Sequence, residues 1–492
     1  MSAEEVVKRL RESFKNGKTL PVENRVKQLK ALKRMYEENK KEMCDVLAKD
    51  LRKSTQEAIV LEIDFLLNDI THTLMNIHEW VKPEYPSKGF INLLDSIYIC
   101  NDPYGVALVI GAWNYPLQLT MMPVAGAIAA GNCVVLKPSE LASASEKFLC
   151  ETIPKYLDSD VVQVYTGGVK ETTELLKQRF DYIFFTGSTT TGKIVHSAAN
   201  KYLTPVTLEL GGKSPVYIDN TVNISTTVRR LLWGKMTNAG QTCVAPDYVL
   251  CTKEVEAKIL EAAKVIIKEF YGEDVKQSPD FCRIINDRHF DRVVRLLSSG
   301  KVALGGDYDA KERYIAPTIL TGVSENDPVM QDEIFGPVLP IINVEDVKGA
   351  IDFINGREKP LAMYIFSNNS KNVDLILENT SAGGITVNDT VMHLGVDTLP
   401  FGGVGMSGMG SYHGKFSFDT FTHKKSVLHK NLGAMGEKLG MARYPPYSNS
   451  KIQYLKFMLA PSAGIPLIKH FPKLIIFMMG YAANYVIKKY YK

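Results

Sequence analysis

Residues Val106-Ala107-Leu108-Val109-Ile110 form a short, continuous apolar run that ends at Gly111. Such a run is typical of a β-strand that is buried on both faces, as the strands of a parallel sheet are. A stretch rich in small residues follows with helical spacing and ends at Ala129-Ala130-Gly131. We therefore predict a strand followed by a helix, which together make the first unit of a parallel sheet.

The same alternation continues toward the C-terminus. Helices are expected at residues 171–179 and 188–199, and another is expected to run from a capping box of Ser143 and Glu146 toward Tyr156. Strands that alternate with helices form parallel βαβ units, so the pattern predicts a doubly wound sheet. Its further strands are expected at residues 133–136, 161–165, 182–185 and 206–208.

Two further regions flank this alternation. Apolar residues at helical spacing, such as Val26, Leu29 and Leu32, predict helices over residues 20–81. A second alternating region begins near Ser214 and predicts another α/β domain. Its helices are expected at residues 228–235 and 255–270, and its strands at 248–251 and 386–388.

The composition is that of a soluble globular enzyme with two or three domains, since 45% of the 492 residues are apolar and 23% are charged. The net charge of +4 does not favour nucleic-acid binding. Seven cysteines, without a Cys-x-x-Cys pair or a neighbouring His cluster, argue against a disulfide framework and a metal site and indicate a reducing compartment. The charged N-terminus is not a secretory signal.

One cysteine lies in a turn-prone segment, Asn238-Ala239-Gly240-Gln241-Thr242-Cys243, and not in an apolar run. We interpret Cys243 as a nucleophile, although a cysteine is by default a small buried hydrophobe. A nucleophile of this kind also needs an oxyanion donor and a base. Asn114, after the first strand, is either that donor or part of an Asx turn. Glu209 ends an apolar strand and is either a base with a raised pKa or a charge that faces water.

A phosphate-binding turn is the next candidate. The segment from Gly187 to Gly192-Lys193 lies between a strand and a helix, whose N-terminus offers free N–H groups. It matches a P-loop except at Ile194, and it lacks part of the Gly-x-Gly-x-x-Gly dinucleotide fingerprint. Ordinary turn and helix chemistry explains it equally well.

Three other segments are candidates for binding a cofactor. Lys137 and Glu140 follow a strand, where they either bind ribose hydroxyls or form a solvated turn. Glu333-Ile334-Phe335-Gly336-Pro337 places an acid and an aromatic residue before a rigid turn. Pro400-Phe401-Gly402-Gly403-Val404-Gly405 places an aromatic residue in a glycine-rich loop, where it could cover a flat ligand. Alone, each of the last two segments is typical of a structural loop.

Together these segments resemble the aldehyde dehydrogenase superfamily, and they occur in its order and rough spacing. The resemblance covers about residues 26–447. The short N-terminus and the segment Arg443-Tyr444-Pro445-Pro446 are most like the class 3 branch, and the apolar tail is similar to that of its microsomal members that oxidise fatty aldehydes. The most specific segments are Ala112-Trp113-Asn114-Tyr115-Pro116, Leu208-Glu209-Leu210-Gly211-Gly212-Lys213, Gly240-Gln241-Thr242-Cys243 and Glu333-Ile334-Phe335-Gly336-Pro337.

The resemblance implies an α/β fold of three parts and a homodimer. A Rossmann-like NAD-binding domain with a five-stranded sheet would comprise residues 1–83 and 103–210, and a catalytic domain would comprise residues 211–400. A small oligomerisation arm would comprise residues 84–102 and 417–428. A linker and a membrane-associated tail would occupy residues 441–492.

The resemblance also implies a role for each candidate residue. Cys243 would attack an aldehyde, Asn114 and the Cys243 backbone N–H would hold the oxyanion, and Glu209 would activate water to release a carboxylic acid from the thioester. The cofactor would be NAD, with NADP tolerated, since Glu140 favours a free 2′-hydroxyl. The residues implied to contact the cofactor are Lys137, Glu140, Gly187, Ser188, Gly192, Glu333, Phe335 and Phe401.

Three other functions stay open at this point. The first is a dehydrogenase that passes the thioester to coenzyme A, which Glu209 disfavours because its presence favours water. The second is a P-loop nucleotide hydrolase, which Ile194 disfavours because that position should hold the magnesium-binding Ser or Thr. The third is a non-catalytic scaffold protein, which the complete set of catalytic residues disfavours.

The tail is the part least like the family. Residues 474–487 are uncharged and mostly apolar, and Lys488-Lys489 follow. The run is shorter than the roughly 20 residues of a spanning helix, so we expect it to attach at a membrane surface or, alternatively, to dock on a subunit. By the resemblance, the membrane is that of the endoplasmic reticulum, with the catalytic domain facing the cytosol. A cytoplasmic protein is the alternative.

Overall fold

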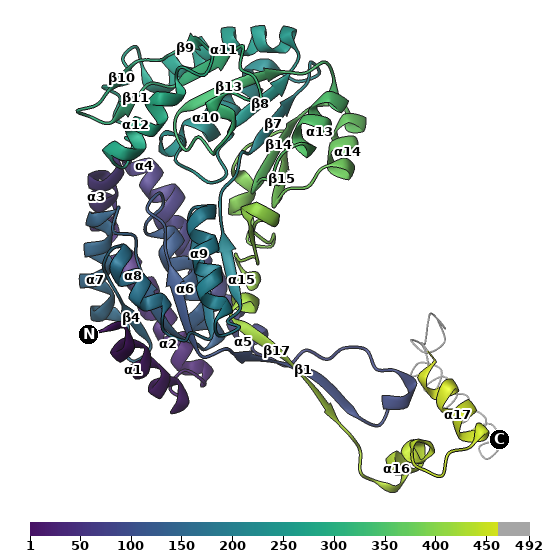
Figure 1. Cartoon of the computed structure of the whole chain (residues 1–492). Coiled ribbons are helices and arrows are strands. Elements are labelled where there is room, and N and C mark those ends of the chain that lie inside the picture. The colour runs from purple at the N-terminus through teal and green to yellow at the C-terminus, as the bar shows by residue number, and fades with distance from the viewer. Residues whose placement is uncertain (461–492) are drawn as a thin grey trace, which may run out of the picture. The chain divides into compact units, whose positions relative to one another are not determined.

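The predicted strand at Val106–Ile110 is present as strand β2, and all five of its residues are buried. The structure is a computed structural model that describes residues 1–460, and Figure 1 shows its elements. The strands of the first sheet besides β2 are β3 (Cys133–Lys137), β4 (Val162–Val164), β5 (Tyr182–Thr186), β6 (Val206–Glu209) and β16 (Gly408–Met409). Five of them are parallel, in the order β6-β5-β2-β3-β4, and β16 pairs antiparallel with β6.

Helices cover both faces of this sheet. Alternate side chains of β2 point to opposite faces and pack in two separate hydrophobic cores. Ala107 and Val109 pack in one core with α2 (Val22–Glu38), α5 (Asp64–Trp80), α6 (Gln118–Ala130) and α7 (Ser143–Tyr156). Val106, Leu108 and Ile110 pack in the other core with α1 (Ala3–Lys15), α8 (Val169–Leu176) and α9 (Thr189–Asn200). The doubly wound sheet predicted from the alternation is confirmed.

The N-terminal region is helical, as its apolar spacing predicts. Between α2 and α5 lie α3 (Lys40–Leu51), α4 (Thr55–Ala58) and a π-helical turn, η1 (Ile59–Ile63). A π-helical turn is rare and is often found at functional sites. In η1 it accompanies Glu62, whose side chain is fully buried.

The capping box predicted at the start of α7 is wrong. The N-cap residue is Ala142, and no side chain of the expected box caps the helix. Instead, the two carboxylate oxygens of Asp50 accept hydrogen bonds from the backbone N–H groups of Ala144 and Ser145, each at 2.9 Å. A carboxylate at this position also favours the positive end of the helix dipole. The acid that satisfies the helix therefore comes from a distant residue, which local spacing cannot indicate.

The second alternating region is α/β, as predicted, and it contains a seven-stranded sheet. Its strands are β7 (Pro215–Ile218), β8 (Tyr248–Cys251), β9 (Lys301–Leu304), β12 (Thr318–Thr321), β13 (Val338–Asn343), β14 (Ala362–Phe366) and β15 (Gly384–Val387). They lie in the order β15-β14-β7-β8-β13-β12-β9, and every pairing is parallel except that of β9 with β12. The main helices are α10 (Ile224–Met236), α11 (Lys253–Tyr271), α12 (Asp287–Leu296), α13 (Val347–Asn355) and α14 (Ser370–Asn379).

The described residues divide into two compact units, and the smaller one contains residues 82–100 and 424–460. A two-stranded sheet of β1 (Ser96–Pro103) and β17 (Thr422–His429) precedes α16 (Ala434–Gly440) and α17 (Asn449–Leu459). Within this unit, Lys424 Nζ lies 2.7 Å from the Glu84 carboxylate, and Lys430 Nζ lies 2.6 Å from that of Asp95. Residues 417–420, which we expected in the arm, lie in α15 (Lys415–Thr420) of the larger unit.

The apolar run at residues 474–487, expected to attach to a membrane, lies outside the described residues. Among residues 1–460, no helix combines the length and the apolar character needed to cross a bilayer. The last described helix, α17, carries exposed apolar side chains at Ile452, Phe457 and Leu459.

Candidate active site

The candidate residues of the first sheet meet at one edge of it. Asn114 follows β2, Lys137 ends β3, Gly187 follows β5, and Glu209 ends β6. Because these strands are parallel, all four residues lie at the carboxyl ends of the strands. Ligands of doubly wound sheets bind at these ends, near the point where the strand order reverses, which here is at β2.

The predicted nucleophile lies after a tight turn, η3 (Thr237–Gly240), which follows α10. Three successive residues of this turn are left-handed, with φ of 53° at Asn238, 52° at Ala239 and 76° at Gly240. Left-handed backbone costs free energy for residues other than glycine, so it persists where the surroundings fix it. We call residues 237–243 the nucleophile loop. Its last residue, Cys243, is partly exposed, while Thr242 before it is buried.

Side-chain amides fix the nucleophile loop from within. Gln241 Nε2 donates to the carbonyl oxygens of Asn238 at 3.0 Å and of Arg283 at 2.9 Å, and its Oε1 accepts from the backbone N–H of Ile285 at 3.0 Å. Asn238 Nδ2 donates to the Gln241 carbonyl at 3.1 Å. Both side chains are fully buried, so each hydrogen bond that is lost would leave a buried polar group unpaired.

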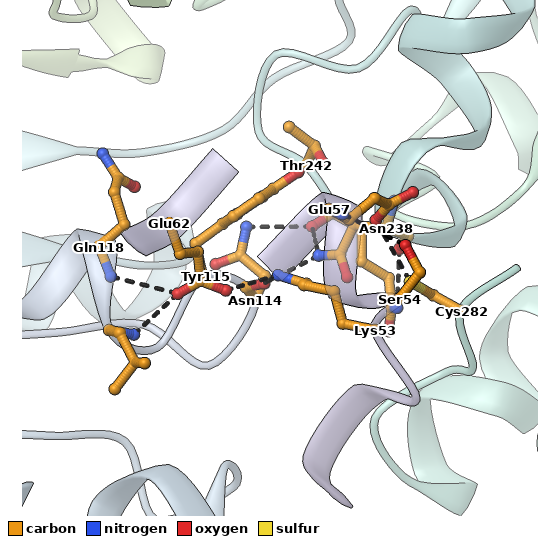
Figure 2. A network of polar contacts seen from close by, with 12 residues as sticks. Lys53, Ser54, Glu57, Glu62, Asn114, Tyr115, Gln118, Asn238, Thr242 and Cys282 are labelled. Atoms are coloured by element: carbon orange, nitrogen blue, oxygen red, sulfur yellow. Dashed lines mark hydrogen bonds and ion pairs between the residues drawn. The ribbon is translucent and has the colours of Figure 1, made fainter. Parts of the chain in front are cut away.

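The same loop fixes Asn114, as Figure 2 shows. Asn114 Nδ2 donates to the Gln241 carbonyl at 3.0 Å, and the Asn114 carbonyl accepts from Asn238 Nδ2 at 2.8 Å. The neighbouring Tyr115 hydroxyl lies 2.8 Å from Thr242 Oγ1. The Asn114 side chain therefore bonds across the fold to the loop that ends in Cys243, and the alternative of a local Asx turn is wrong.

Glu209 is a desolvated carboxyl group and not a charge that faces water. It is buried, and neither of its carboxyl oxygens has a hydrogen-bond partner among the described residues. Burial raises the pKa of Glu209 well above its ordinary value. A carboxyl group with a raised pKa is suited to general base chemistry near neutral pH.

The thiol of Cys243 is held in its neutral form by the same surroundings. Burial raises its pKa above the ordinary value, and the carboxyl groups of Glu333 and Glu209 raise it further. The backbone N–H groups of Cys243 and Val244 oppose this by stabilising a thiolate. Because the thiolate is the reactive form, attack requires that the thiol proton be removed as part of the reaction.

Glu333 lies against the glycine pair that follows β6. A Cβ atom on Gly211 would come within 2.0 Å of Glu333 Oε2, so this carboxyl group occupies space that a side chain would fill. Burial raises the pKa of Glu333 to about 8, and the neighbouring Asp247 carboxylate adds to the rise. Phe335, two residues on, has a φ of 49°, and its ring packs edge-on against Trp113 at 5.2 Å.

Lys137 and Glu140 form an ion pair in which the lysine is buried and the glutamate is exposed. Lys137 is buried, and its Nζ donates to the Pro138 carbonyl at 2.6 Å and to Glu140 Oε2 at 3.0 Å. Glu140 is exposed. The pair places a donor and an acceptor together at the carboxyl edge of the sheet, which suits a vicinal diol such as that of ribose.

The segment that begins at Gly187 does not form a P-loop. Ser188 is the N-cap of α9, and its Oγ accepts from the backbone N–H of Thr191 at 3.3 Å. Since α9 begins at Thr189, the second glycine of the motif, Gly192, lies inside the helix, where an added Cβ would come within 2.6 Å of Leu210. There is therefore no loop of the length that cradles phosphate in a P-loop, and that interpretation is wrong.

Phe401 is buried among aromatic side chains. Its ring stacks on His413 at 4.9 Å and meets Tyr412 edge-on at 5.7 Å. The backbone of Phe401 also exchanges hydrogen bonds with that of Tyr412. The ring is thus fixed by its neighbours, whereas the sequence indicated a more open position in a glycine-rich loop.

Comparisons with known proteins agree on one family. A model of the aldehyde dehydrogenase family matches residues 1–427. The chain is 52% identical to aldehyde dehydrogenase family 3 member A2 of Rattus norvegicus, over 93% of this chain and 94% of that protein. It is 53% identical to the dimeric, NADP-preferring aldehyde dehydrogenase of Mus musculus, over 90% of this chain and 97% of that protein. The solved structure of Staphylococcus aureus AldH in its substrate-bound state matches with a TM-score of 0.89 and 41% identity, covering 92% of this chain and 98% of that one.

The nucleophile loop predicts the effect of a single added methyl group. Gly240 has a φ of 76°, and a Cβ atom there would come within 2.2 Å of the Gly336 carbonyl oxygen. We expect Gly240→Ala to move the loop and to lower any activity that depends on Cys243 by at least about tenfold, since small misplacements of reacting groups are costly. Enzyme assay and thermal unfolding check this.

Gly272→Ala is the matched control, because Gly272 has a φ of 82° but no atom lies within 4 Å of an added Cβ. That variant should lose about 1–3 kcal/mol of stability from backbone strain, since Gly272 has a ψ of -170° that residues other than glycine rarely adopt at this φ, and should keep its activity. Equal activity in the two variants would show that the close packing of Gly240 on the Gly336 carbonyl does not position Cys243.

Proposed function

The chain belongs to the aldehyde dehydrogenase family, and from this premise we propose that Cys243, Asn114 and Glu209 carry out its reaction. The protein is an aldehyde dehydrogenase of class 3 and oxidises aldehydes with NAD(P) as the cofactor. The observation that carries the assignment is the hydrogen bond from Asn114 Nδ2 to the Gln241 carbonyl, which fixes the candidate oxyanion donor to the loop of the candidate nucleophile.

In the first step, the thiol proton passes to water as the Cys243 sulfur adds to the aldehyde carbon, and the carbonyl oxygen becomes an oxyanion. The Asn114 amide and the Cys243 backbone N–H stabilise this oxyanion. Losing one such donor usually costs ~3 kcal/mol of transition-state stabilisation. Oxidation then removes the hydrogen on that carbon as hydride, so that the collapsing oxyanion becomes the carbonyl of a thioester on Cys243.

The residues at the carboxyl edge of the sheet fit a dinucleotide. Lys137 and Glu140 present a donor and an acceptor for a ribose diol. The Glu333 carboxyl group, packed on Gly211, suits a second ribose. NAD(P) bound here supplies the hydride acceptor for the oxidation. The residues proposed to hold it are Lys137, Glu140, Gly187, Ser188, Gly192, Glu333, Phe335 and Phe401.

Glu209 is proposed to complete the reaction by taking a proton from a water molecule that attacks the thioester. The products are a carboxylic acid and the free Cys243 thiol. Its lack of a hydrogen-bond partner among the described residues supports this role, because both oxygens remain available to a water molecule. A base at this position favours water over coenzyme A as the acyl acceptor.

Medium- to long-chain fatty aldehydes are the proposed substrates. Ala112, Tyr115 and Leu119 form a small buried apolar cluster, against which Leu61 packs. Tyr115 joins this cluster to the nucleophile loop through its hydrogen bond with Thr242. An alkyl chain that extends from Cys243 along these side chains would gain ~0.8 kcal/mol for each methylene group that it buries.

Homodimerisation and membrane attachment are proposed for the smaller unit and the tail. One relative is named as dimeric. The smaller unit exposes large apolar side chains at Leu432, Met435, Tyr447, Phe457 and Leu459. Such side chains suit contact with a second subunit or with lipid. We propose that residues 441–492 attach the enzyme to the endoplasmic reticulum, with its catalytic part in the cytosol.

Two variants separate the two halves of the reaction. Cys243→Ser should abolish NADH formation and leave NAD binding unchanged. Glu209→Gln should release about one equivalent of NADH rapidly and then turn over at least ~100-fold more slowly, because only deacylation is impaired. Stopped-flow absorbance of NADH and titration calorimetry measure these effects, and full steady-state turnover by either variant would refute the corresponding role.

The pH dependence of deacylation is the control for the Glu209 assignment. The carboxylate is the active base, and the pKa of Glu209 lies well above its ordinary value, so deacylation should still accelerate with rising pH at values where an ordinary glutamate is already fully ionised. In Glu209→Gln the slow deacylation should lack this acceleration. The same acceleration in both proteins would show that another group is the base.

The substrate proposal predicts that kcat/KM increases with the chain length of the aldehyde, by up to about fourfold for each methylene group. Leu119→Asn should remove most of the increase for long aldehydes, because it places an amide in the apolar cluster, and should leave short aldehydes unaffected. Steady-state kinetics over a series of straight-chain aldehydes test this. A kcat/KM that is independent of chain length would contradict it.

Membrane attachment has its own test, which compares the full chain with one that ends at Tyr447. In cell fractionation, the full chain should sediment with membranes and the shortened chain should remain in the supernatant. A full-length protein in the supernatant would refute the proposal.

A further inference from the structure

A buried ion pair lies next to the candidate oxyanion donor. Lys53 Nζ is 2.6 Å from Glu62 Oε1, and both side chains are fully inaccessible to solvent. Burying two charges is expensive, and a buried ion pair is often no more stabilising than apolar residues of the same size. Its contribution to the fold therefore does not explain why it is here, and the groups that the pair contacts suggest another role.

Glu62 fixes the start of helix α6. Its second oxygen, Oε2, accepts hydrogen bonds from the backbone N–H groups of Leu117 at 2.9 Å and Gln118 at 3.2 Å. Leu117 is the N-cap of α6 and provides no side-chain cap of its own. The carboxylate thus replaces the missing cap, and its negative charge lies at the positive end of the helix dipole.

Lys53 fixes the residues just before that helix. Its Nζ donates to the Asn114 carbonyl at 3.2 Å and lies 4.1 Å from the centre of the Tyr115 ring. The first contact is a charge-assisted hydrogen bond, and the second is a cation–π interaction in a desolvated place, where such contacts are strongest. Figure 2 shows Lys53, Glu62, Asn114 and Tyr115 gathered in this one network.

The two charges together hold the segment 114–118 at both ends. Lys53 holds Asn114 and Tyr115, while Glu62 holds Leu117 and Gln118. From this segment, Asn114 Nδ2 reaches the Gln241 carbonyl, and the Tyr115 hydroxyl reaches Thr242. Thr242 directly precedes Cys243. The pair therefore determines how the Asn114 amide lies relative to the nucleophile.

We propose that Lys53 and Glu62 are positioning residues, which act through Asn114 to place the oxyanion donor opposite Cys243. This inference rests on the proposed function, since it requires that Asn114 stabilise the oxyanion. Neither residue touches the reacting atoms. A displacement of the donor by about 1 Å can cost up to roughly a hundredfold in rate, so loss of the pair should slow thioester formation.

The test uses Lys53→Met/Glu62→Gln in the full chain, which removes both charges without leaving either one unpaired. The glutamine that replaces Glu62 also retains an oxygen that can accept from the start of α6. We expect the NADH burst, which reports thioester formation, to slow by at least roughly tenfold. The Kd for NAD and the KM for aldehyde should stay within about threefold of the wild-type values, since the pair does not contact either ligand. An unchanged burst rate would overturn the proposal.

A double-mutant cycle with Asn114→Ala separates positioning from a general loss of structure. If the pair acts through Asn114, the double substitution should slow the burst by less than about threefold in the Asn114→Ala background. An equal slowing in both backgrounds would overturn the proposal. If Asn114→Ala alone leaves the burst unchanged, the oxyanion assignment itself fails, and this outcome is distinct from failure of the positioning role.

Lys53→Arg provides a second route through the same cycle. It keeps the buried positive charge and its partner Glu62, so it should fold even if the double variant does not. The branched head of arginine cannot reproduce the single donor at the Asn114 carbonyl, so the burst should slow severalfold in the wild-type background and not with Asn114→Ala. Slowing by the same factor in both backgrounds would again contradict the proposal.

Lys253→Met/Glu256→Gln is the matched control. Lys253 Nζ lies 2.5 Å from Glu256 Oε1, and the Glu256 side chain is almost fully buried. This pair lies at the start of α11, where Glu256 Oε2 also accepts a hydrogen bond from Asn343 Nδ2. Removing it should change thermal stability and leave the burst rate as in the wild type. Because the Lys253 side chain is exposed, the control tests the loss of a Lys–Glu pair whose carboxylate is buried. Slowing of the burst as large as that of the Lys53 and Glu62 variant would show that loss of any such pair has this effect.

Discussion

The carbonyl oxygen of Asn114 is the point on which the rest of the site depends. It accepts hydrogen bonds from Asn238 in the nucleophile loop and from Lys53 in the N-terminal helical region. The side-chain amide of the same residue donates to the Gln241 carbonyl. An unpaired polar group in such a buried place would cost about 1–3 kcal/mol, so each bond restricts the others. The left-handed turn before Cys243 persists because this network leaves it little freedom to relax.

Desolvation is the second constraint, and it explains the chemical character of the site. Burial raises the pKa of Glu209, of Glu333 and of the Cys243 thiol together. The raised pKa values favour the neutral forms of these three groups, and a neutral thiol is a weaker nucleophile than a thiolate. The same burial makes Glu209 a stronger base once its proton has left. In a site open to water, the Glu209 carboxylate would be hydrated and would therefore be a weaker base.

Much of this arrangement could be predicted from the sequence because its signals are local. Short apolar runs predicted the five parallel strands of the first sheet and the strands β8 and β15 of the second. The residues that follow the strands of the first sheet, such as Asn114 and Glu209, could be assigned to one edge. The contribution of Lys53 and Glu62 could not be predicted. Within a helical region rich in Lys and Glu, nothing in the spacing distinguishes a buried pair from a solvated one. The two residues become informative only when the fold brings residue 114 beside them.

The errors have the same cause. The cap of α7 comes from Asp50, far along the chain, where local spacing suggested Ser143 and Glu146. A P-loop was open because the motif gives no sign that α9 begins at Thr189. Both wrong interpretations rest on local motifs. The contact with Asp50 and the position at which α9 begins are set by the fold, and the motifs do not reveal them.

The central claim is that Cys243, alone among the seven cysteines, carries the acyl group during turnover. The most direct measurement is acid quenching of the wild-type enzyme with NAD and a fatty aldehyde, followed by peptide mapping by mass spectrometry. We predict an acyl thioester on the peptide that contains Cys243 and unmodified thiols at the other six positions. An acyl group on another cysteine, or turnover without any acylated peptide, would contradict this claim.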